Sequence, residues 1–259
     1  MKIWYQSGAS LGRDPAWAEY EAALNSNLNN IARPDTEVVV HGVELFSHYD
    51  DKFQFEGFFH DRQIIENAIR AEREGYDAFC VGCARDPAGV ALREVVDIPV
   101  SNLLETSMHV ACLLSPNFSL LAHGKPLLRR QIELVKRYGL TERFIECDSF
   151  EVSLDDLQGG FENPRTVLDP ALKVAEEAAR KGVCLFVNAC GCTNAIMGKH
   201  CLHEVGGIPV LDGAAVAIKM TEMLVDLKKI GVDRSKLGSF NPVPKDILAS
   251  VLHLYGVKE

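Results

Sequence analysis

The chain has 259 residues, of which 47% are hydrophobic and 24% charged, and its formal net charge is −9. This length allows one large domain or two of about 120 residues each. The acidic balance argues against a nucleic-acid partner, because phosphate contacts need clustered Lys and Arg. No segment reaches the ~18 consecutive apolar residues of a membrane span. We therefore expect a small-molecule partner, and neither nucleic acid nor membrane.

The first residues, MKIWYQSGAS, lack the basic and then apolar layout of a signal peptide and are typical of a first β-strand. We therefore expect a cytoplasmic protein. In that reducing compartment the eight cysteines would be thiols, which indicates chemistry or packing and not a disulfide framework.

Strand-like runs alternate with helix-like ones along the whole chain. After a strand over residues 2–7, Asp14 is expected to cap a helix with Pro15 at its first position. The other predicted strands cover residues 36–43, 77–82, 98–103, 118–123, 143–148, 183–189 and 208–213. The predicted helices include residues 60–75, 126–139 and 170–182, a long one through about Lys229, and a short one near the C-terminus. This pattern predicts an α/β fold of mainly parallel sheets flanked by helices, with ligands at the carboxyl ends of the strands.

One stretch of the sequence occurs twice. Residues 94–100 read EVVDIPV and residues 204–210 read EVGGIPV, so five of seven positions match at an offset of 110. Each copy follows a helix, an apolar strand and a cysteine-containing loop, and precedes another helix. This order indicates an internal duplication and predicts two pseudo-symmetric lobes with the active site in the cleft between them. We expect residues 1–115 and 212–259 to form the first lobe and residues 116–211 the second.

The two cysteine loops would then face each other across the cleft. The first is VGCARDPAG with Cys83, and the second is NACGCTN with Cys190 and Cys192. A racemase must remove a proton from one face of a carbon and return one to the other face, so it needs a base and an acid on opposite sides. A thiolate and a thiol can exchange these roles. The start of a helix after each loop would favour the thiolate.

These two blocks resemble the aspartate/glutamate/hydantoin racemase superfamily, especially its hydantoin racemase branch. VGCARDPAGVALREVVDIPV is similar to the family's first cysteine motif, and GCTN with GGIPVLDGAAVAIKMTEMLVDL is similar to the second. The resemblance covers roughly residues 60 to 230. It implies two α/β lobes, acid/base cysteines, and neither metal nor cofactor. Relatives on this scaffold isomerise maleate or decarboxylate arylmalonates, so the fold does not fix the reaction.

The first family cysteine corresponds to Cys83, but two residues compete for the second position. Counted back from the proline of each repeat, Cys192 matches Cys83 within one residue, and it lies in the Gly-Cys-Thr string. Counted forward from the glycine that ends the preceding helix, Cys190 lies eight residues on, as Cys83 does. We favour Cys192 and keep Cys190 as the alternative.

Other roles for the cysteines are weaker. CGCTNAIMGKHCLH offers ligands for zinc, and Cys190 with Cys192 could form a redox pair. Zinc knuckles and oxidoreductase motifs usually place two residues between their cysteines, and here there is one. The remaining five lie on apolar strands or helices, where free Cys packs as a small hydrophobe: Cys80, Cys112, Cys147, Cys184 and Cys201.

Polar residues near the predicted cleft are candidates for substrate binding. They are Gln6, Ser7, Arg85, Glu105, Thr106, Thr193 and Asn194. The alternatives are a plain turn for the first two and helix capping for the last two. Asp86 is expected to cap a helix that begins at Pro87.

The sequence thus predicts a cofactor-independent racemase or epimerase that uses Cys83 and Cys192 beside a carbonyl or carboxylate. Its substrate would be a small carboxylate or cyclic amide, such as a hydantoin or an amino acid. The alternatives are a maleate-type isomerase, an arylmalonate-type decarboxylase, or a noncatalytic binding protein. Since enzymes of this kind often pair, a homo-oligomer is a further expectation.

Overall fold

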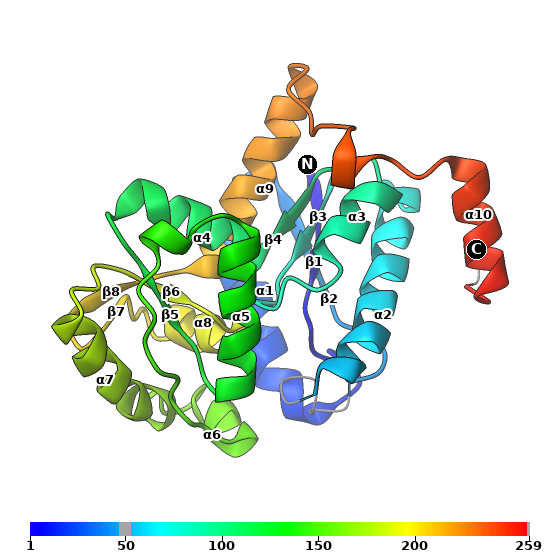
Figure 1. The fold of residues 1–259 in the computed structure, drawn as a ribbon. Coiled ribbons are helices and arrows are strands. Elements are labelled where there is room, and N and C mark those ends of the chain that lie inside the picture. The colour runs from blue at the N-terminus through cyan, green and yellow to red at the C-terminus, as the bar shows by residue number, and fades with distance from the viewer. Residues whose placement is uncertain (47–52, 258–259) are drawn as a thin grey trace.

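The computed structural model describes residues 1–46 and 53–257, in which two four-stranded sheets are each flanked by helices (Figure 1). The first sheet is wholly parallel and has the order β2-β1-β3-β4. Its strands are β1 (Lys2–Gln6), β2 (Glu37–His41), β3 (Ala78–Val81) and β4 (Val100–Asn102). All of β3 and four of five residues of β1 are buried, as expected of strands covered on both faces. The predicted α/β fold is confirmed.

The second sheet has the order β5-β6-β8-β7. Its parallel strands are β5 (Ser119–Leu121), β6 (Phe186–Asn188) and β8 (Ile208–Leu211), and β7 (Glu204–Val205) pairs antiparallel with β8. The predicted strand at residues 143–148 is wrong. Phe144 forms only an isolated bridge to Phe118. Between this bridge and a second one, from Phe150 to His123, the Asp148 N–H donates to the Glu177 carboxylate of α7, so the pairing beside β5 is interrupted.

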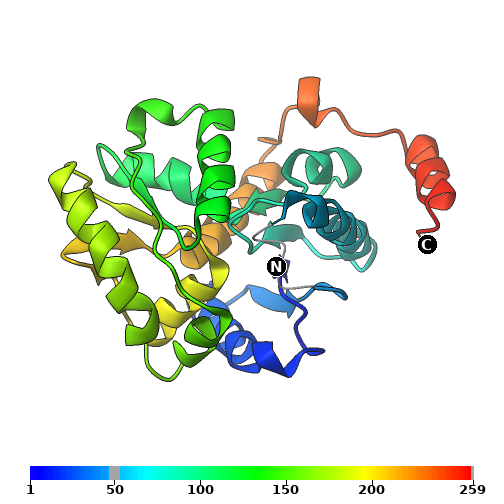
Figure 2. The same ribbon diagram turned by 60° about the horizontal axis from the view of Figure 1, so that its bottom comes forward.

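Helices connect and cover the strands. They are α1 (Ala18–Ile31), α2 (Gln54–Arg73), α3 (Gly89–Val95), α4 (Leu103–Leu114), α5 (Lys125–Arg137), α6 (Leu154–Gly159), α7 (Arg165–Arg180), α8 (Gly191–Lys199), α9 (Gly213–Lys229) and α10 (Lys245–Leu254), with short 3-10 turns at Pro15–Trp17, Thr141–Arg143 and Gly238–Phe240. The α2 helix begins six residues before the predicted start. At the far edge of the molecule, α10 lies beyond α2 (Figure 2). No helix in the described part of the chain is long and apolar enough to cross a membrane.

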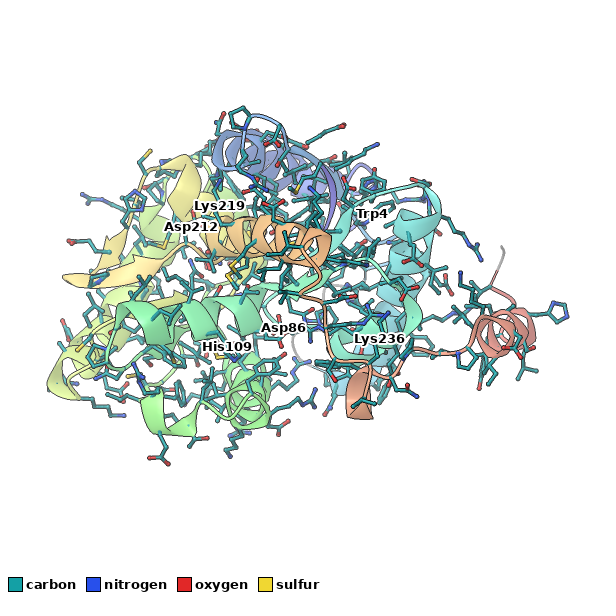
Figure 3. All side chains as sticks on the ribbon, turned by 90° about the horizontal axis from the view of Figure 1, so that it is seen from above. Trp4, Asp86, His109, Asp212, Lys219 and Lys236 are labelled. Atoms are coloured by element: carbon teal, nitrogen blue, oxygen red, sulfur yellow. The ribbon has the colours of Figure 1, made fainter. Side chains whose placement is uncertain are left out.

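The two sheets are joined by α1, α4 and α9. Although α9 follows β8 of the second sheet, it packs on the first, where Thr221 hydrogen-bonds Ser101 of β4 at 2.5 Å. Figure 3 shows α9 running beside α4, and a Cβ atom on Gly213 would lie 2.8 Å from the Ser107 hydroxyl. One apolar cluster includes Ile3 of the first sheet and Phe186 of the second. The sheets therefore meet over a continuous core, while the predicted lobe boundaries stay a prediction.

The repeated sequence does not adopt one structure throughout. Glu94 lies in α3, whereas Glu204 lies in the short strand β7. Only the Ile-Pro-Val half leads into corresponding strands, β4 and β8. The repeat therefore identifies β4 and β8 as equivalent strands, whereas the residues just before them differ in secondary structure.

Candidate active site

Cys83 lies two residues beyond the end of β3, beside the loop that follows β1. The Gly82 N–H donates to the Gln6 carbonyl at 2.8 Å, which extends the pairing of the two strands. A Cβ atom on Gly8 would lie 3.2 Å from Cys83 Sγ, so the half-buried thiol lies against the Gly8 backbone. Parallel neighbouring strands thus bring the Ser7–Gly8 turn next to Cys83.

The other candidate cysteines lie at the start of α8, just after β6. Cys190 is the N-cap residue and is half-buried, while Cys192 is the second residue of the helix and is buried. The first N–H groups of a helix have no partner within it, and their partial positive charge stabilises a nearby anion. This position favours the thiolate form of a cysteine.

The loops of Cys83 and Cys192 are in contact, although they belong to different sheets. A Cβ atom on Gly191 would lie 2.7 Å from the Gly82 carbonyl oxygen and 2.8 Å from the Tyr20 hydroxyl. The absence of a side chain at Gly191 therefore lets the two loops approach each other. The structure brings the three candidate thiols to one junction, as the predicted facing loops require.

Tyr20 of α1 reaches this junction and was not among the predicted site residues. Burial raises the pKa of its phenol, and the thiols of Cys192, Cys190 and Cys83 raise it further, Cys192 most strongly. A hydrogen bond links the phenol to the Ser7 side chain. The phenol therefore stays protonated at neutral pH and can donate to an anion. In the sequence Tyr20 is only one more apolar residue on a helix face, with no signal of this role.

Thr193 and Asn194 hold the second loop in place. The Thr193 hydroxyl donates to the Asn188 side chain at 2.5 Å. The Asn194 amide donates to the Cys190 carbonyl at 2.8 Å and accepts from the Gly213 N–H at 2.8 Å, which ties α8 to α9. Cys190 is the N-cap residue of α8, and the side chains of Thr193 and Asn194 donate to its carbonyl, so the capping alternative is wrong for this helix. Direct contact with substrate stays a prediction.

Gln6 and Ser7 differ in their surroundings. The Gln6 side chain is wholly buried, accepts from Trp4 and Asn67, and donates to the Ser7 carbonyl. The Ser7 hydroxyl accepts from the Ala9 N–H at 3.1 Å and faces Tyr20. Of the two, only Ser7 reaches the cysteine junction.

Glu105 and Thr106 bond within the protein near the start of α4. Glu105 pairs with Arg93 at 2.5 Å, and the Thr106 hydroxyl donates to the Asn102 carbonyl at 2.7 Å. A role for either in substrate binding stays a prediction.

Asp86 does not cap a helix beginning at Pro87, so that prediction is wrong. Its backbone is left-handed, with φ 45°, and its side chain turns to the start of α4, where it accepts from the N–H groups of Leu104 and Glu105. Tyr138 is the residue that follows α5, and its hydroxyl donates to the Asp86 carboxylate at 3.0 Å. Burial raises the pKa of the Asp86 carboxyl to about 7. Asp86 thus links the Cys83 loop to the start of α4 and to the end of α5.

Arg85 is tied to the Cys83 region through His60 of α2. The His60 Nε2 lies 2.8 Å from the Gly8 carbonyl, and its Nδ1 lies 3.1 Å from an Arg85 nitrogen. A carbonyl only accepts and a guanidinium only donates, so the hydrogen must be on Nε2. Buried His60 therefore fixes both the turn against which Cys83 lies and the arginine two residues beyond it.

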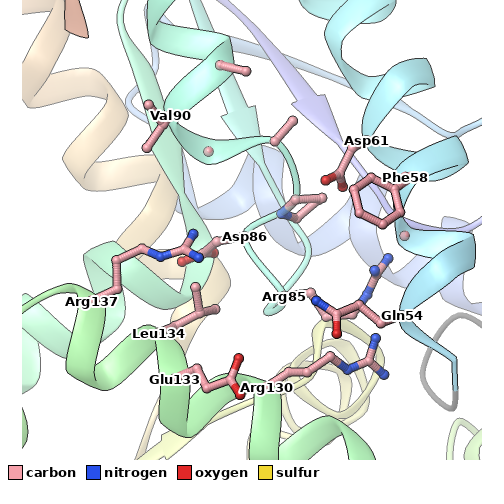
Figure 4. Close-up of a pocket in the computed structure, with 15 residues that line it drawn as sticks. Gln54, Phe58, Asp61, Arg85, Asp86, Val90, Arg130, Glu133, Leu134 and Arg137 are labelled. Atoms are coloured by element: carbon pink, nitrogen blue, oxygen red, sulfur yellow. The ribbon is translucent and has the colours of Figure 1, made fainter. Parts of the chain in front are cut away.

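A cavity of about 340 Å³ lies beside this arginine, between α2, the Cys83 loop and α5 (Figure 4). Asp61, Arg85, Arg130 and Arg137 are among its lining residues, and none of the cysteines is. Burial raises the pKa of Asp61. Charged groups of both signs thus surround an opening next to the candidate site.

Within residues 1–46 and 53–257, no group of three or more His, Cys, Asp or Glu side chains is arranged to hold a metal ion. Cys190 and Cys192 lie at the start of α8, whereas His200 and Cys201 lie past its end. Of the five cysteines predicted to pack in the core, Cys80 and Cys147 are buried and Cys112 is half-buried. Cys184 and Cys201 are exposed, so for them the prediction is wrong. Cys184 lies before β6 begins, and Cys201 follows the end of α8.

Residues 18–221 match the sequence model of the Asp/Glu/hydantoin racemase family. The chain belongs to this family. It is therefore an enzyme of the isomerase class, a racemase. The hydantoin racemase of Pseudomonas sp. (strain NS671) is 29% identical over 231 residues, which cover 87% of each chain. The hydantoin racemase of Paenarthrobacter aurescens is 29% identical over 71% of this racemase and 76% of its own length.

Solved structures show the same fold. The allantoin racemase of Pseudomonas fluorescens superimposes with a TM-score of 0.75 at 19% identity, covering 95% of this racemase and 98% of that chain. A Gly74Cys mutant of arylmalonate decarboxylase superimposes with a TM-score of 0.57 at 14% identity, covering 92% of this racemase and 97% of that chain. The scaffold of this racemase is thus shared with an enzyme named for another reaction.

Proposed function

We propose that this racemase inverts a stereocentre next to a carbonyl in a hydantoin-like cyclic amide, with Cys83 and Cys192 as the opposing acid and base. The observation that carries the proposal is the contact between the two cysteine loops at Gly82 and Gly191. The two hydantoin racemases similar in sequence support the substrate class.

The proton moves in two steps. One cysteine, as thiolate, takes the proton from the ring carbon beside the carbonyl, and the electron pair of that C–H bond passes to the carbonyl as an enolate. The other cysteine, as thiol, gives its proton to the opposite face of that carbon and becomes the thiolate. The thiols thereby exchange roles, and proton exchange with solvent restores the first state. The N–H groups at the start of α8 are placed to stabilise a thiolate or an enolate oxygen.

Cys192, in the Gly-Cys-Thr string and within the first turn of α8, stays the preferred partner of Cys83, with Cys190 as the alternative. No step requires a metal or cofactor, and turnover is expected to survive chelators. Reduced thiols are needed throughout, which agrees with a cytoplasmic location.

Proton NMR in D₂O tests this proposal on single enantiomers of 5-substituted hydantoins, allantoin, aspartate and glutamate, with maleate and an arylmalonate alongside. The expected result is exchange of the proton at the stereocentre together with loss of optical purity. Cys83→Ser and Cys192→Ser should each lower racemisation by about 10²- to 10⁴-fold, while Cys184→Ser, at an exposed thiol, serves as the control. If Cys190→Ser lowers racemisation and Cys192→Ser does not, Cys190 is the second base. If the products show decarboxylation or cis-trans isomerisation, the enzyme catalyses that reaction instead.

A further inference from the structure

Gln131 is a polar residue on the buried side of α5. That side of the helix is otherwise apolar, with Leu127, Leu128, Leu134 and Val135 buried at the spacing of one helical face. Gln131 lies in the middle of this stripe and is wholly buried. A leucine or a methionine would complete the stripe without burying an amide. The amide is therefore expected to have a task beyond packing.

The Gln131 amide bonds to both cysteine loops. Its nitrogen donates to the Ala84 carbonyl at 3.1 Å and to the Ala189 carbonyl at 2.7 Å. Ala84 directly follows Cys83, and Ala189 directly precedes Cys190. Since both partners are carbonyls, which only accept, the nitrogen and not the oxygen of the amide must face them. One NH₂ group thus holds the two loops at a fixed separation.

The apolar surroundings of this amide make both bonds important. Ala84 and Ala189 belong to the same apolar cluster as Leu128 and Leu134 and are 2% and 0% exposed. A backbone carbonyl in such a place has lost its bond to water, so leaving it without a partner is costly. The Gln131 oxygen has no hydrogen-bond partner within the described residues, so only the two donor bonds offset the burial of the amide.

The same helix holds the Cys83 loop at a second point. Tyr138 follows Gln131 by seven residues, which is about two helical turns, and its hydroxyl donates to Asp86. The Cys83 loop is thus bound to α5 at both Ala84 and Asp86. Because α5 follows β5 of the second sheet and the Cys83 loop follows β3 of the first, these bonds cross the junction between the two sheets. A displacement of one sheet against the other would have to break them.

We propose that Gln131 is a positioning residue that sets the distance between the two catalytic thiols and thereby favours inversion of the substrate over simple proton exchange. This role rests on the proposed two-cysteine racemisation. After one thiolate has taken the proton, the opposite thiol can deliver a proton to the other face, which inverts the centre. Alternatively, the first thiol exchanges its proton with solvent and returns one to the same face. Inversion needs both thiols at the correct distance, whereas exchange with retention needs only one.

Initial rates in D₂O with a single enantiomer of a 5-substituted hydantoin test this role. Chiral chromatography with mass detection separates the deuterated starting enantiomer from the deuterated opposite one, and an enzyme-free sample gives the background. Gln131→Met keeps the length of the side chain but cannot donate. Because a misplacement of ~1 Å can cost about 100-fold in rate, inversion should fall by about that factor, while exchange with retention falls less. The ratio of retained to inverted deuterated hydantoin should therefore rise in the variant.

Asn117→Leu is the matched control. The Asn117 amide also bonds two backbone groups, because it donates to the Gly182 carbonyl at 3.1 Å and accepts from the Cys184 N–H at 2.9 Å. These residues precede β5 and β6, whereas the loop with Cys190 follows the carboxyl end of β6. Loss of the Asn117 bonds should lower the melting temperature and leave the ratio of retained to inverted product unchanged.

Gln131→Asn guards against misfolding of Gln131→Met. It keeps an amide that is one methylene shorter and cannot reach both carbonyls, so the ratio should rise here too, with circular dichroism confirming the fold. Backbone hydrogen–deuterium exchange gives a measurement that does not depend on turnover. The N–H groups of the two cysteine loops should exchange faster in both Gln131 variants than in the wild type, and those that precede β5 and β6 should not.

Three results would contradict this role. If inversion and exchange with retention fall by the same factor in the folded variants, or if neither falls, Gln131 does not set the distance between the thiols. Wild-type rates of hydrogen exchange in both loops of the variants also overturn it. A wild type that inverts none of the compounds refutes the proposed function and with it the role of Gln131 in racemisation, and hydrogen exchange then shows separately whether Gln131 holds the loops.

Discussion

Gly191 and Gly82 touch across the junction of the two sheets: a Cβ atom on Gly191 would come within 2.7 Å of the Gly82 carbonyl oxygen. Each glycine is next to a candidate catalytic cysteine. The atom in the way belongs to the backbone and cannot swing aside as a side chain could. Gly191→Ala must therefore push the two loops apart. Because a misplacement of ~1 Å can cost about 100-fold in rate, we expect kcat/KM on the true substrate to fall by about that factor.

Gly159→Ala is the matched control for this change. A Cβ atom there would meet nothing nearer than the Thr166 methyl group at 3.9 Å. Alanine also favours the helical backbone of α6, so activity and melting temperature should be kept or slightly raised. If Gly191→Ala keeps full activity as well, contact between the loops does not matter for catalysis.

Tyr20→Phe removes a hydroxyl that lies among three thiols. The raised pKa keeps this phenol protonated, so it can donate to a thiolate at neutral pH. A hydrogen bond to a charged group is worth ~1.5–3 kcal/mol, so we expect a 10- to 100-fold loss in kcat/KM with little change in melting temperature. Tyr76→Phe is the control, because it removes a phenol hydroxyl that bonds the His41 ring at 3.1 Å. Equal activity of the two variants would leave Tyr20 a packing residue.

The positions of Cys83 and Tyr20 show what the sequence could and could not predict. Cys83 was predicted because its loop follows an apolar strand, has a counterpart in the second half of the chain and resembles the family's first cysteine motif, and ligands gather at strand ends in parallel sheets. Tyr20 was missed because its position at the thiols depends on how α1 crosses from one sheet to the other, which no local pattern encodes. Asp86 was misassigned for a related reason. Asp-Pro is typical of a helix start, but a left-handed backbone at Asp86 sends its side chain to a helix 17 residues further along the chain.

His60 is expected to position Cys83 without touching the substrate. His60→Leu removes the imidazole bonds to the Gly8 carbonyl and to an Arg85 nitrogen, and each such bond is worth ~0.5–1.5 kcal/mol. His60→Gln can keep both bonds, since its amide nitrogen donates and its oxygen accepts. We expect the Leu variant to lose at least tenfold in kcat and the Gln variant to keep most of it.

A structural role alone would also lower stability, so the test needs a direct view of the thiol. The rate at which iodoacetamide alkylates Cys83 can be followed against pH by peptide mass spectrometry. If His60 positions Cys83, this profile shifts in the Leu variant and is restored in the Gln variant. An unchanged profile in a destabilised Leu variant would reduce His60 to a packing residue.

Asp86 is expected to make stability depend on pH in an unusual direction for a carboxylate. Burial raises its pKa from an ordinary value of 3.8 to about 7, so between these values the folded state binds more protons than the unfolded state. Its contribution to the free energy of unfolding is then complete below about pH 4 and is lost as the pH rises through about 7. Asp86→Asn cannot ionise. This variant should therefore remove the pH dependence of the free energy of unfolding. Its weaker capping of α4 should lower that free energy by the same amount at every pH.

Urea unfolding of both proteins across this range measures the effect. The difference in free energy of unfolding between wild type and Asp86→Asn should move in favour of the variant by on the order of a few kcal/mol between about pH 4 and pH 7, and then stay level. A difference that is constant with pH would mean that Asp86 is ionised throughout, held so by the Leu104 and Glu105 N–H groups and the Tyr138 hydroxyl. Since Asp86 also anchors the Cys83 loop, the same titration should appear in the pH profile of kcat if ionised Asp86 sets the position of that loop.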